Sequence, residues 1–257
     1  MPDLTVSYIK PDYSLCQKIF ENQLLIWNIS LGSAMPVHKL FTLEDRGGFV
    51  IGAFDQTDII GHAVLMPAWD SQRHEPFLYL DMVGVLPLYR NQHLAERMVR
   101  LAGKRAQELQ YASMQWTFDP LESANANLYI KKLGARAVRF HRDYYGLAPT
   151  LPQAADRFWV RWEFTSHTIP LNRPERTISL ASNEAIGFPK RGEPIAIAVP
   201  RDFRDIIQTA PDHAEAVRLR SREVFTPLFQ ADYTITGFLR AESQNYYIAS
   251  HPHTEVE

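Results

Sequence analysis

The segment YLDMVGVLPLYRNQHLAERMV, residues 79–99, carries the most information about the fold. Residues 76–85 are apolar on both faces apart from Asp81, a pattern typical of a central strand that is buried on two sides. From residue 94 to residue 109, apolar side chains recur at helical spacing. A strand that leads directly into a helix presents unpaired backbone N–H groups at the positive end of the helix dipole. The segment therefore predicts an anion site that fits a pyrophosphate.

The chain on both sides of this segment alternates between helices and strands. Helices are expected over residues 14–31, 36–42 and 123–132, the last ended by Gly134. A first strand is expected before residue 14, and further strands are expected over residues 49–54, 59–66, 114–118 and 137–141. This order predicts an α/β fold, in which helices flank a mixed sheet and an antiparallel hairpin leads into a βαβ-like second half.

A loop rich in Pro and Gly follows residue 164, and we place a boundary there. The predicted domains are residues 1–165 and a C-terminal α+β extension over residues 166–257. In the extension we expect a strand, two helices and two strands, over residues 195–199, 202–207, 213–228, 233–239 and 246–250. This order repeats that of the first third of the chain. The sequence leaves open whether the extension is a degenerate half-repeat.

Composition limits the classes of protein to consider. The 257 residues are 46% hydrophobic and 22% charged, with a net charge of -2, which describes a globular chain without the basic excess that nucleic acid requires. The single cysteine, Cys16, is expected to be a small buried hydrophobe. The N-terminal segment lacks a signal-peptide pattern, and no run of 18 apolar residues occurs. We expect a cytoplasmic protein with no membrane, nucleic-acid or metal partner.

Residues 90–95 resemble the acyl-CoA-binding motif of the GNAT acyltransferase superfamily, an Arg or Gln, two residues, Gly, one residue, then Gly or Ala. Arg90 and Ala95 match the motif, whereas His93 replaces its middle glycine. Glycine lets the backbone approach the phosphates closely. Two interpretations of His93 stay open: it adds a donor to the pyrophosphate, or its bulk weakens or abolishes coenzyme binding.

A further resemblance, to a GNAT subgroup of predicted acetyltransferases, covers most of the chain. It is carried by residues 47–48, 116–121, 125–126, 133–135, 144–146, 156–158 and 195–238 and by Trp162. The resemblance implies an N-acyltransferase that moves an acetyl or succinyl group from acetyl-CoA or succinyl-CoA to the amine of a small molecule, such as an amino acid. The extension would then close over the acceptor site or form a homodimer. An inactive GNAT scaffold that binds a metabolite or a partner is the alternative.

The resemblance also implies where the coenzyme binds. In GNAT folds the pantetheine arm lies between two splayed strands, here residues 78–85 and 114–118, and the pyrophosphate lies at the following helix. The implied coenzyme-binding residues are Met82, Val83, Gly84, Val85, Arg90, Asn91, Gln92, His93, Leu94, Ala95, Ser123 and Asn125. A backbone N–H near residues 82–84 would stabilise the oxyanion.

Three residues are candidates for catalysis by direct attack of an amine on the thioester. Asp81, the charged residue inside an apolar strand, is the expected general base, or else a structural carboxylate paired with a buried donor. Tyr129 is a candidate general acid, but it lies five residues before Gly134, where many GNAT enzymes place a tyrosine four residues before. Tyr145 could reach the acceptor pocket or be part of the core. The neighbouring pair Asp156–Arg157 is expected to form an ion pair or to anchor an acidic substrate group.

Overall fold

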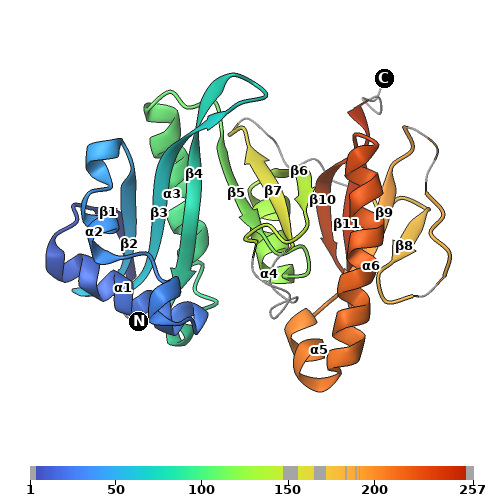
Figure 1. Ribbon diagram of the computed structural model, residues 1–257, viewed down its shortest axis with the longest axis horizontal. Helices are drawn as coiled ribbons and strands as arrows, with labels where there is room; N and C mark the ends of the chain where they lie inside the picture. Colours follow the sequence, from blue (N-terminus) through green and yellow to red (C-terminus); the bar gives the residue numbers. More distant parts are fainter. Residues whose placement is uncertain are drawn as a thin grey trace. The chain divides into compact units, whose positions relative to one another are not determined.

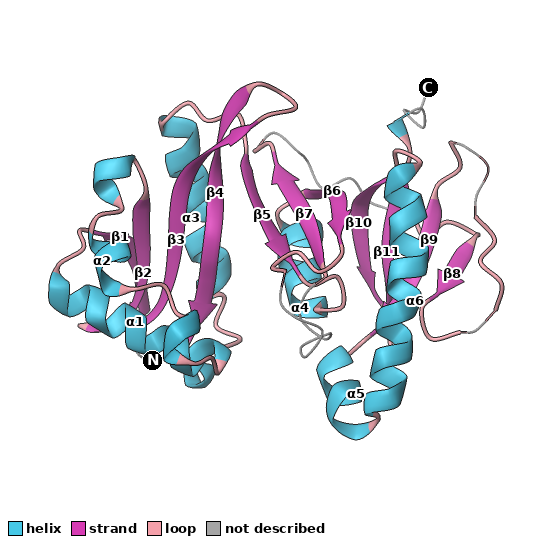
Figure 2. Ribbon diagram, viewed as in Figure 1, coloured by secondary structure: helices cyan, strands magenta, loops and turns pink. Residues whose placement is uncertain are grey.

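A computed structural model describes residues 4–146, 156–164, 172–182, 184–188, 190 and 192–252 (Figure 1). The chain divides into two compact units, Met1–Trp116 and Thr117–Glu257, and each is described by itself. Helices, strands and loops of both units are distinguished in Figure 2. Within the described part of the chain, none of the helices has the length and apolar character needed to cross a membrane.

The first unit is a mixed sheet with helices on both faces. Its strands follow the order β1-β2-β3-β4-β5, in which only β5 runs parallel to its neighbour. Figure 1 shows α1 in front of this sheet and α3 behind it. The bounds are β1 (Leu4–Ile9), α1 (Tyr13–Trp27), α2 (Val37–Phe41), β2 (Phe49–Asp55), β3 (Asp58–Asp70), β4 (Glu75–Val85), α3 (Leu94–Glu108) and β5 (Met114–Phe118).

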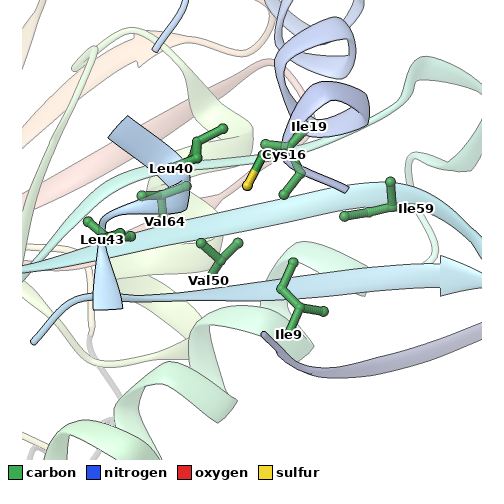
Figure 3. Close-up of a cluster of buried hydrophobic side chains, with 8 residues drawn as sticks. All are labelled: Ile9, Cys16, Ile19, Leu40, Leu43, Val50, Ile59 and Val64. Atoms are coloured by element: carbon green, nitrogen blue, oxygen red, sulfur yellow. The ribbon is translucent and has the colours of Figure 1, made fainter. Parts of the chain in front are cut away.

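Local chemistry sets the ends of α1, and its apolar face makes a core with the sheet. The Asp12 carboxylate accepts a hydrogen bond from the Leu15 N–H at 2.8 Å, and Asn28 ends the helix in the left-handed region with φ 50°. Cys16 is fully buried in this core, as predicted. Figure 3 shows the cluster formed by Ile9, Cys16, Ile19, Leu40, Leu43, Val50, Ile59 and Val64.

The second unit continues with strands and helices from both the predicted GNAT region and the extension. Its strand order is β7-β6-β10-β11-β9-β8, with β8 parallel to β9 and the other pairs antiparallel. The bounds are α4 (Ser123–Ala126), η4 (Asn127–Lys132), β6 (Arg136–His141), β7 (Arg157–Trp162), β8 (Thr177–Ser179), β9 (Ile195–Pro200), α5 (Phe203–Thr209), α6 (Pro211–Gln230), β10 (Thr234–Arg240) and β11 (Gln244–Ser250). β7 and β8 were missing from the sequence prediction.

Aromatic rings fill the core of the second unit. Phe158 of β7 is fully buried, and its ring centroid lies 4.8 Å from that of Phe225 on α6 and 5.3 Å from that of Tyr247 on β11. The Tyr247 hydroxyl donates to the Pro120 carbonyl at 2.7 Å. Strands and a helix of the extension therefore share one core with β7.

Two ion pairs join α6 to the end of β5 and to the start of β7. Arg218 donates two bonds of 2.7 Å to the Asp119 carboxylate, and both side chains are largely buried. Arg222 donates bonds of 2.8 and 2.9 Å to the Asp156 carboxylate. The predicted ion pair between Asp156 and Arg157 is therefore wrong, because the Asp156 carboxylate turns to α6. Arg157 donates to the Asp156 backbone carbonyl instead, at 2.9 Å.

The extension has the predicted order of elements, but its strand pairing differs from that of the first unit. The strand before the two helices pairs with the first hairpin strand in the first unit, as β1 with β2. In the extension, β9 pairs with β11, the second strand of the hairpin. The element order thus recurs without the sheet arrangement that a half-repeat would carry. The predicted domain boundary at residues 165–166 lies outside the described residues, and it stays a prediction.

Candidate functional site

The site in the first unit starts where β4 and β5 stop pairing. Within the described residues, their parallel ladder covers only Leu78 with Met114 and Tyr79 with Gln115. The rest of β4, down to Val85, is paired with β3 on its other side. Met82, Val83, Gly84 and Val85 all lie on this part of the strand. Its outer edge can therefore offer backbone groups to an extended ligand.

Asp81 lies at a β-bulge, where the ladder passes from Val64 opposite Met82 to Leu65 opposite Leu80. A bulge residue has no cross-strand partner, and it turns its strand locally. The sequence predicts a buried carboxylate here, but the Asp81 side chain is exposed because of this bulge. Desolvation by the surrounding protein nonetheless raises its pKa. Within the described residues, the Asp81 carboxylate has no hydrogen-bond partner.

The loop after β4 is fastened to the first unit from three sides. The Leu86 N–H donates to the Ile60 carbonyl at 2.8 Å, and the Tyr89 hydroxyl donates to the Asp55 carboxylate at 2.9 Å. Arg90 donates through Nη2 to the Ile26 carbonyl at 2.9 Å and through Nε to the Val85 carbonyl at 3.5 Å. The Arg90 guanidinium thus joins the end of α1 to the end of β4.

The loop then delivers a row of backbone donors to the start of α3. Asn91 and His93 both adopt positive φ values, 64° and 58°. Within the described residues, the backbone N–H groups of Asn91, Gln92, Leu94 and Ala95 have no hydrogen-bond partner. We call these four donors the anion cradle. Consecutive N–H groups at the positive end of a helix fit the oxygens of a phosphate or pyrophosphate.

His93 explains why glycine is usual at its place in the motif. Its φ of 58° lies in the left-handed region, which glycine adopts freely and residues with a Cβ adopt rarely. The imidazole is 71% exposed, and its Nδ1 lies 3.6 Å from Glu96 Oε2. This orientation toward the first turn of α3 favours the interpretation in which His93 leaves the site open over the one in which it blocks the site.

The other predicted site residues belong to the second unit. The Ser123 hydroxyl donates to the Pro200 carbonyl at 3.2 Å and accepts a 2.9 Å bond from the Asn245 side chain. These two hydrogen bonds occupy the hydroxyl proton and one lone pair of Ser123. A coenzyme contact through its hydroxyl proton therefore requires that the bond to Pro200 break. Asn125 is half-buried in α4, and its role stays a prediction.

Tyr129 lies in a π-helical segment, which the sequence did not predict. The expected helix over residues 123–132 is an α-helical turn followed by the π-helix η4. A π-helix holds about one residue more per turn than an α-helix. Tyr129, five residues before Gly134, therefore takes nearly the angular position that an α-helix gives to the residue four before. Its ring is buried against Phe118, with centroids 5.5 Å apart, and burial raises the pKa of the Tyr129 phenol.

Tyr145 lies in the turn that follows β6 and is 52% exposed. The Arg157 guanidinium stacks over its ring at 5.0 Å, and the Tyr144 ring lies 5.1 Å away. The cation and the aromatic neighbour orient Tyr145 without burying it. The structure thus gives Tyr129 and Tyr145 different environments within the second unit.

Sequence reasoning missed His62, which lies across the ladder from Gly84. It is fully buried beside Trp27, with ring centroids 5.6 Å apart, and neither ring nitrogen has a partner among the described residues. Burial lowers its pKa to about 4. The available signal was the continuous apolar run of residues 59–66, within which His62 is the one titratable residue. His62 belongs to no metal-binding group, since none of the described residues form a cluster of three or more His, Cys, Asp or Glu side chains that could hold an ion.

Comparisons with known proteins agree with this arrangement. Residues 14–135 match the sequence model described as the acetyltransferase (GNAT) family. No curated protein sequence matches the chain.

The chain is similar to solved structures of acetyltransferases. Arabidopsis thaliana NAA60, in complex with a bisubstrate analogue, superposes with a TM-score of 0.51 at 14% identity, over 63% of this chain and all (100%) of that one. A GNAT family acetyltransferase from Elizabethkingia anophelis with acetyl-CoA bound has a TM-score of 0.47 at 16% identity, over 63% and 99% of the two chains. A chain of the NatC complex bound to Gag peptide and CoA has a TM-score of 0.49 at 18% identity, over 62% and 99%. At these identities the likeness concerns the fold alone.

The family match covers α1 to the turn after η4, and it includes β4, the anion cradle and α3. Residues 14–135 of this chain are a domain of the acetyltransferase (GNAT) family.

Proposed function

We propose that the chain is an N-acyltransferase that moves an acyl group from a CoA thioester to the amine of a small molecule. The anion cradle is the observation that carries this proposal. Its four N–H donors lie at the start of α3, within the family domain, and they fit the pyrophosphate of CoA. The outer edge of β4 beyond Tyr79 is free within the first unit to pair with the pantetheine arm.

The chemistry follows from what the reaction needs. The amine nitrogen attacks the thioester carbonyl, the C–S bond breaks, and the sulfur leaves as a thiolate that takes up a proton. We propose Asp81 as the general base, which takes the proton of the ammonium group directly or through water. Its raised pKa moves the carboxylate toward the range in which such a base works at neutral pH.

The oxyanion and the thiolate need donors. A backbone N–H of residues 82–84 is the proposed oxyanion donor. Tyr129 and Tyr145 are the proposed candidates for the thiolate's proton. Burial raises the pKa of Tyr129, so its phenol is protonated at neutral pH and carries a proton to give. Tyr145 is exposed and carries the positive charge of Arg157 over its ring. Replacing Tyr129 and Tyr145 in turn by phenylalanine distinguishes the two candidates, because loss of the hydroxyl slows turnover only at the residue that donates the proton.

The identities of the acyl donor and of the amine acceptor are further parts of this proposal. The proposed acyl donor is acetyl-CoA or succinyl-CoA, whose acyl groups differ by one carboxylate. The proposed acceptor is an amino acid. The inactive scaffold remains as the second candidate. The exposure of the His93 side chain favours binding of the coenzyme over a blocked site.

The test is calorimetric titration of the full chain with CoA, acetyl-CoA and succinyl-CoA, followed by a thiol-release assay with a panel of amino acids. Gln92→Glu places a negative charge at the anion cradle, and we expect it to weaken binding about fivefold. Gln107→Glu makes the same change about 20 Å along α3 and should leave binding unchanged. Failure of all three coenzymes to bind would refute the proposal. Binding without turnover on any amine would favour the inactive scaffold.

A further inference from the structure

Arg90 belongs to the acyl-CoA motif, but its side chain contacts α1 and β4. Its Nη2 donates to the Ile26 carbonyl at 2.9 Å, and its Nε donates to the Val85 carbonyl at 3.5 Å. Because α1 and α3 lie on opposite faces of the sheet, the guanidinium reaches the face opposite to the helix that carries the anion cradle (Figure 1). The structure therefore directs the Arg90 guanidinium to the end of α1.

The end of α1 has no positive charge of its own. Its last turn contains no basic side chain, and Asn28 then ends the helix in the left-handed region with φ 50°. Carbonyl groups in the last turn of a helix lack intrahelical partners and lie at the negative end of the helix dipole. A guanidinium placed there donates hydrogen bonds to these carbonyls and complements the dipole. From the loop after β4, Arg90 supplies the cation that the sequence of α1 lacks.

The end of α1 packs directly on a strand residue that the proposed reaction uses. A Cβ at Gly84 would lie 2.6 Å from Ile26 Cγ2 and 2.9 Å from Trp27 Cζ2, so this contact needs a glycine. The Trp27 ring also covers His62, which pairs with Gly84 across the ladder, and the two ring centroids are 5.6 Å apart. Ile26 and Trp27 thus support β4 at Gly84, one of the residues 82–84 from which the oxyanion donor is proposed.

We propose that Arg90 is a positioning residue for acyl transfer. It holds Ile26 and Trp27 against Gly84, which fixes the backbone of β4 at the proposed oxyanion donor, and it does not bind the coenzyme. An oxyanion is stabilised by donors held at hydrogen-bond distance from the developing charge, so a small displacement of this backbone lowers kcat more than coenzyme affinity. The inference rests on the proposed function, because it takes β4 beside Gly84 as the place of the thioester.

The substitution Arg90→Met removes the donors and keeps an unbranched side chain. Binding of CoA to the full chain is measured by calorimetry at low and at high salt. We expect the Kd of the variant to stay within about threefold of the native value, because solvent and salt screen a charge that makes no direct contact. Removal of a guanidinium that contacted the pyrophosphate would weaken binding about tenfold and reduce its salt dependence.

Hydrogen exchange followed by mass spectrometry measures whether Arg90 holds the helix end. We expect a peptide that covers residues 20–30 to exchange about fivefold faster in Arg90→Met, the effect of one lost hydrogen bond on local opening. In a thiol-release assay with acetyl-CoA and the amino acid that the native chain acylates, kcat should fall about tenfold, with KM for acetyl-CoA unchanged. The calorimetric stoichiometry counts the protein that binds CoA, so a loss of folded protein is not mistaken for a lower kcat.

Two further variants serve as controls. Arg46 is exposed and donates through Nη1 to the Thr42 carbonyl at 2.9 Å, at the end of α2. Arg46→Met therefore removes the same kind of contact from another helix, and it should leave both kcat and exchange at residues 20–30 as in the native chain. Arg90→Lys keeps the charge and one donor that can reach the Ile26 carbonyl, and it should recover part of kcat.

A loss of CoA affinity of about tenfold in Arg90→Met, with native exchange at residues 20–30, would overturn the inference, make Arg90 a coenzyme ligand and leave the proposed function intact. Native exchange together with native kcat in this variant would also overturn it. A native chain that binds CoA but acylates no amino acid would overturn the positioning role together with the enzymatic proposal. Failure of the native chain to bind CoA, acetyl-CoA or succinyl-CoA would refute the proposed function before any variant is compared.

Discussion

Burial of His62 makes the stability of the protein depend on pH. The imidazole is fully buried against Trp27, and both of its nitrogens lack partners among the described residues. Burial lowers its pKa to about 4, whereas an unfolded histidine titrates near 6.5. Between these values the unfolded chain binds a proton that the folded chain excludes. His62 therefore opposes folding increasingly as the pH falls from 6.5 to 4, and it has little effect above pH 7.

The two pKa values set the size of the effect. Integrated over the full range, protonation of His62 costs about 3 kcal/mol of stability, and about 2 kcal/mol of this is already lost between pH 7 and pH 5. The substitution His62→Leu removes the titrating group and keeps an apolar side chain at the site. Between pH 7 and pH 5 the variant should therefore lose about 2 kcal/mol less than the native chain.

Urea denaturation followed by circular dichroism at both pH values measures this difference. The control is His213→Gln, which removes an exposed histidine on α6 and should leave the pH dependence of the native chain in place. Equal losses of stability in the native chain and His62→Leu would refute the reasoning. Such a result would mean that His62 is protonated in the fold or reaches solvent.

Three other substitutions test the site and the packing. Asp81→Asn should lower turnover by about 10²-fold or more and leave the Kd for acetyl-CoA unchanged; a normal rate in a thiol-release assay would exclude Asp81 as the base. Gly84→Ala should destabilise the protein by about 1–3 kcal/mol in urea denaturation, because the new Cβ would lie 2.6 Å from Ile26 Cγ2; unchanged stability would mean that α1 shifts freely. Arg218→Ala leaves the Asp119 carboxylate buried without its bidentate partner, and a loss of about 3–5 kcal/mol is expected; a loss below 1 kcal/mol would show that solvent already screens the pair.

Periodicity along the chain predicted most elements of the GNAT region because their signals are local. The apolar spacing after residue 94 predicted α3, observed as Leu94–Glu108, and an apolar run predicted β5 at its observed bounds. The arginine and the alanine of a short motif also predicted an anion site at residues 90–95, the segment that carries the cradle donors. Here the donors are backbone groups of four residues within a five-residue segment, so local sequence is enough to bring them together.

Tertiary structure decided what depends on residues distant in the chain. Asp81 is exposed because it is the extra residue of β4 at a bulge between two ladder pairs. The sequence of one strand does not reveal the register with its neighbour. His62 loses its solvent because α1 places Trp27 over it. Asp119 pairs with Arg218, which lies 99 residues later in the chain. Local patterns specify helices, strands and turns, whereas register, burial and long-range pairing arise only when separate elements pack, and these set the charge states in and around the site.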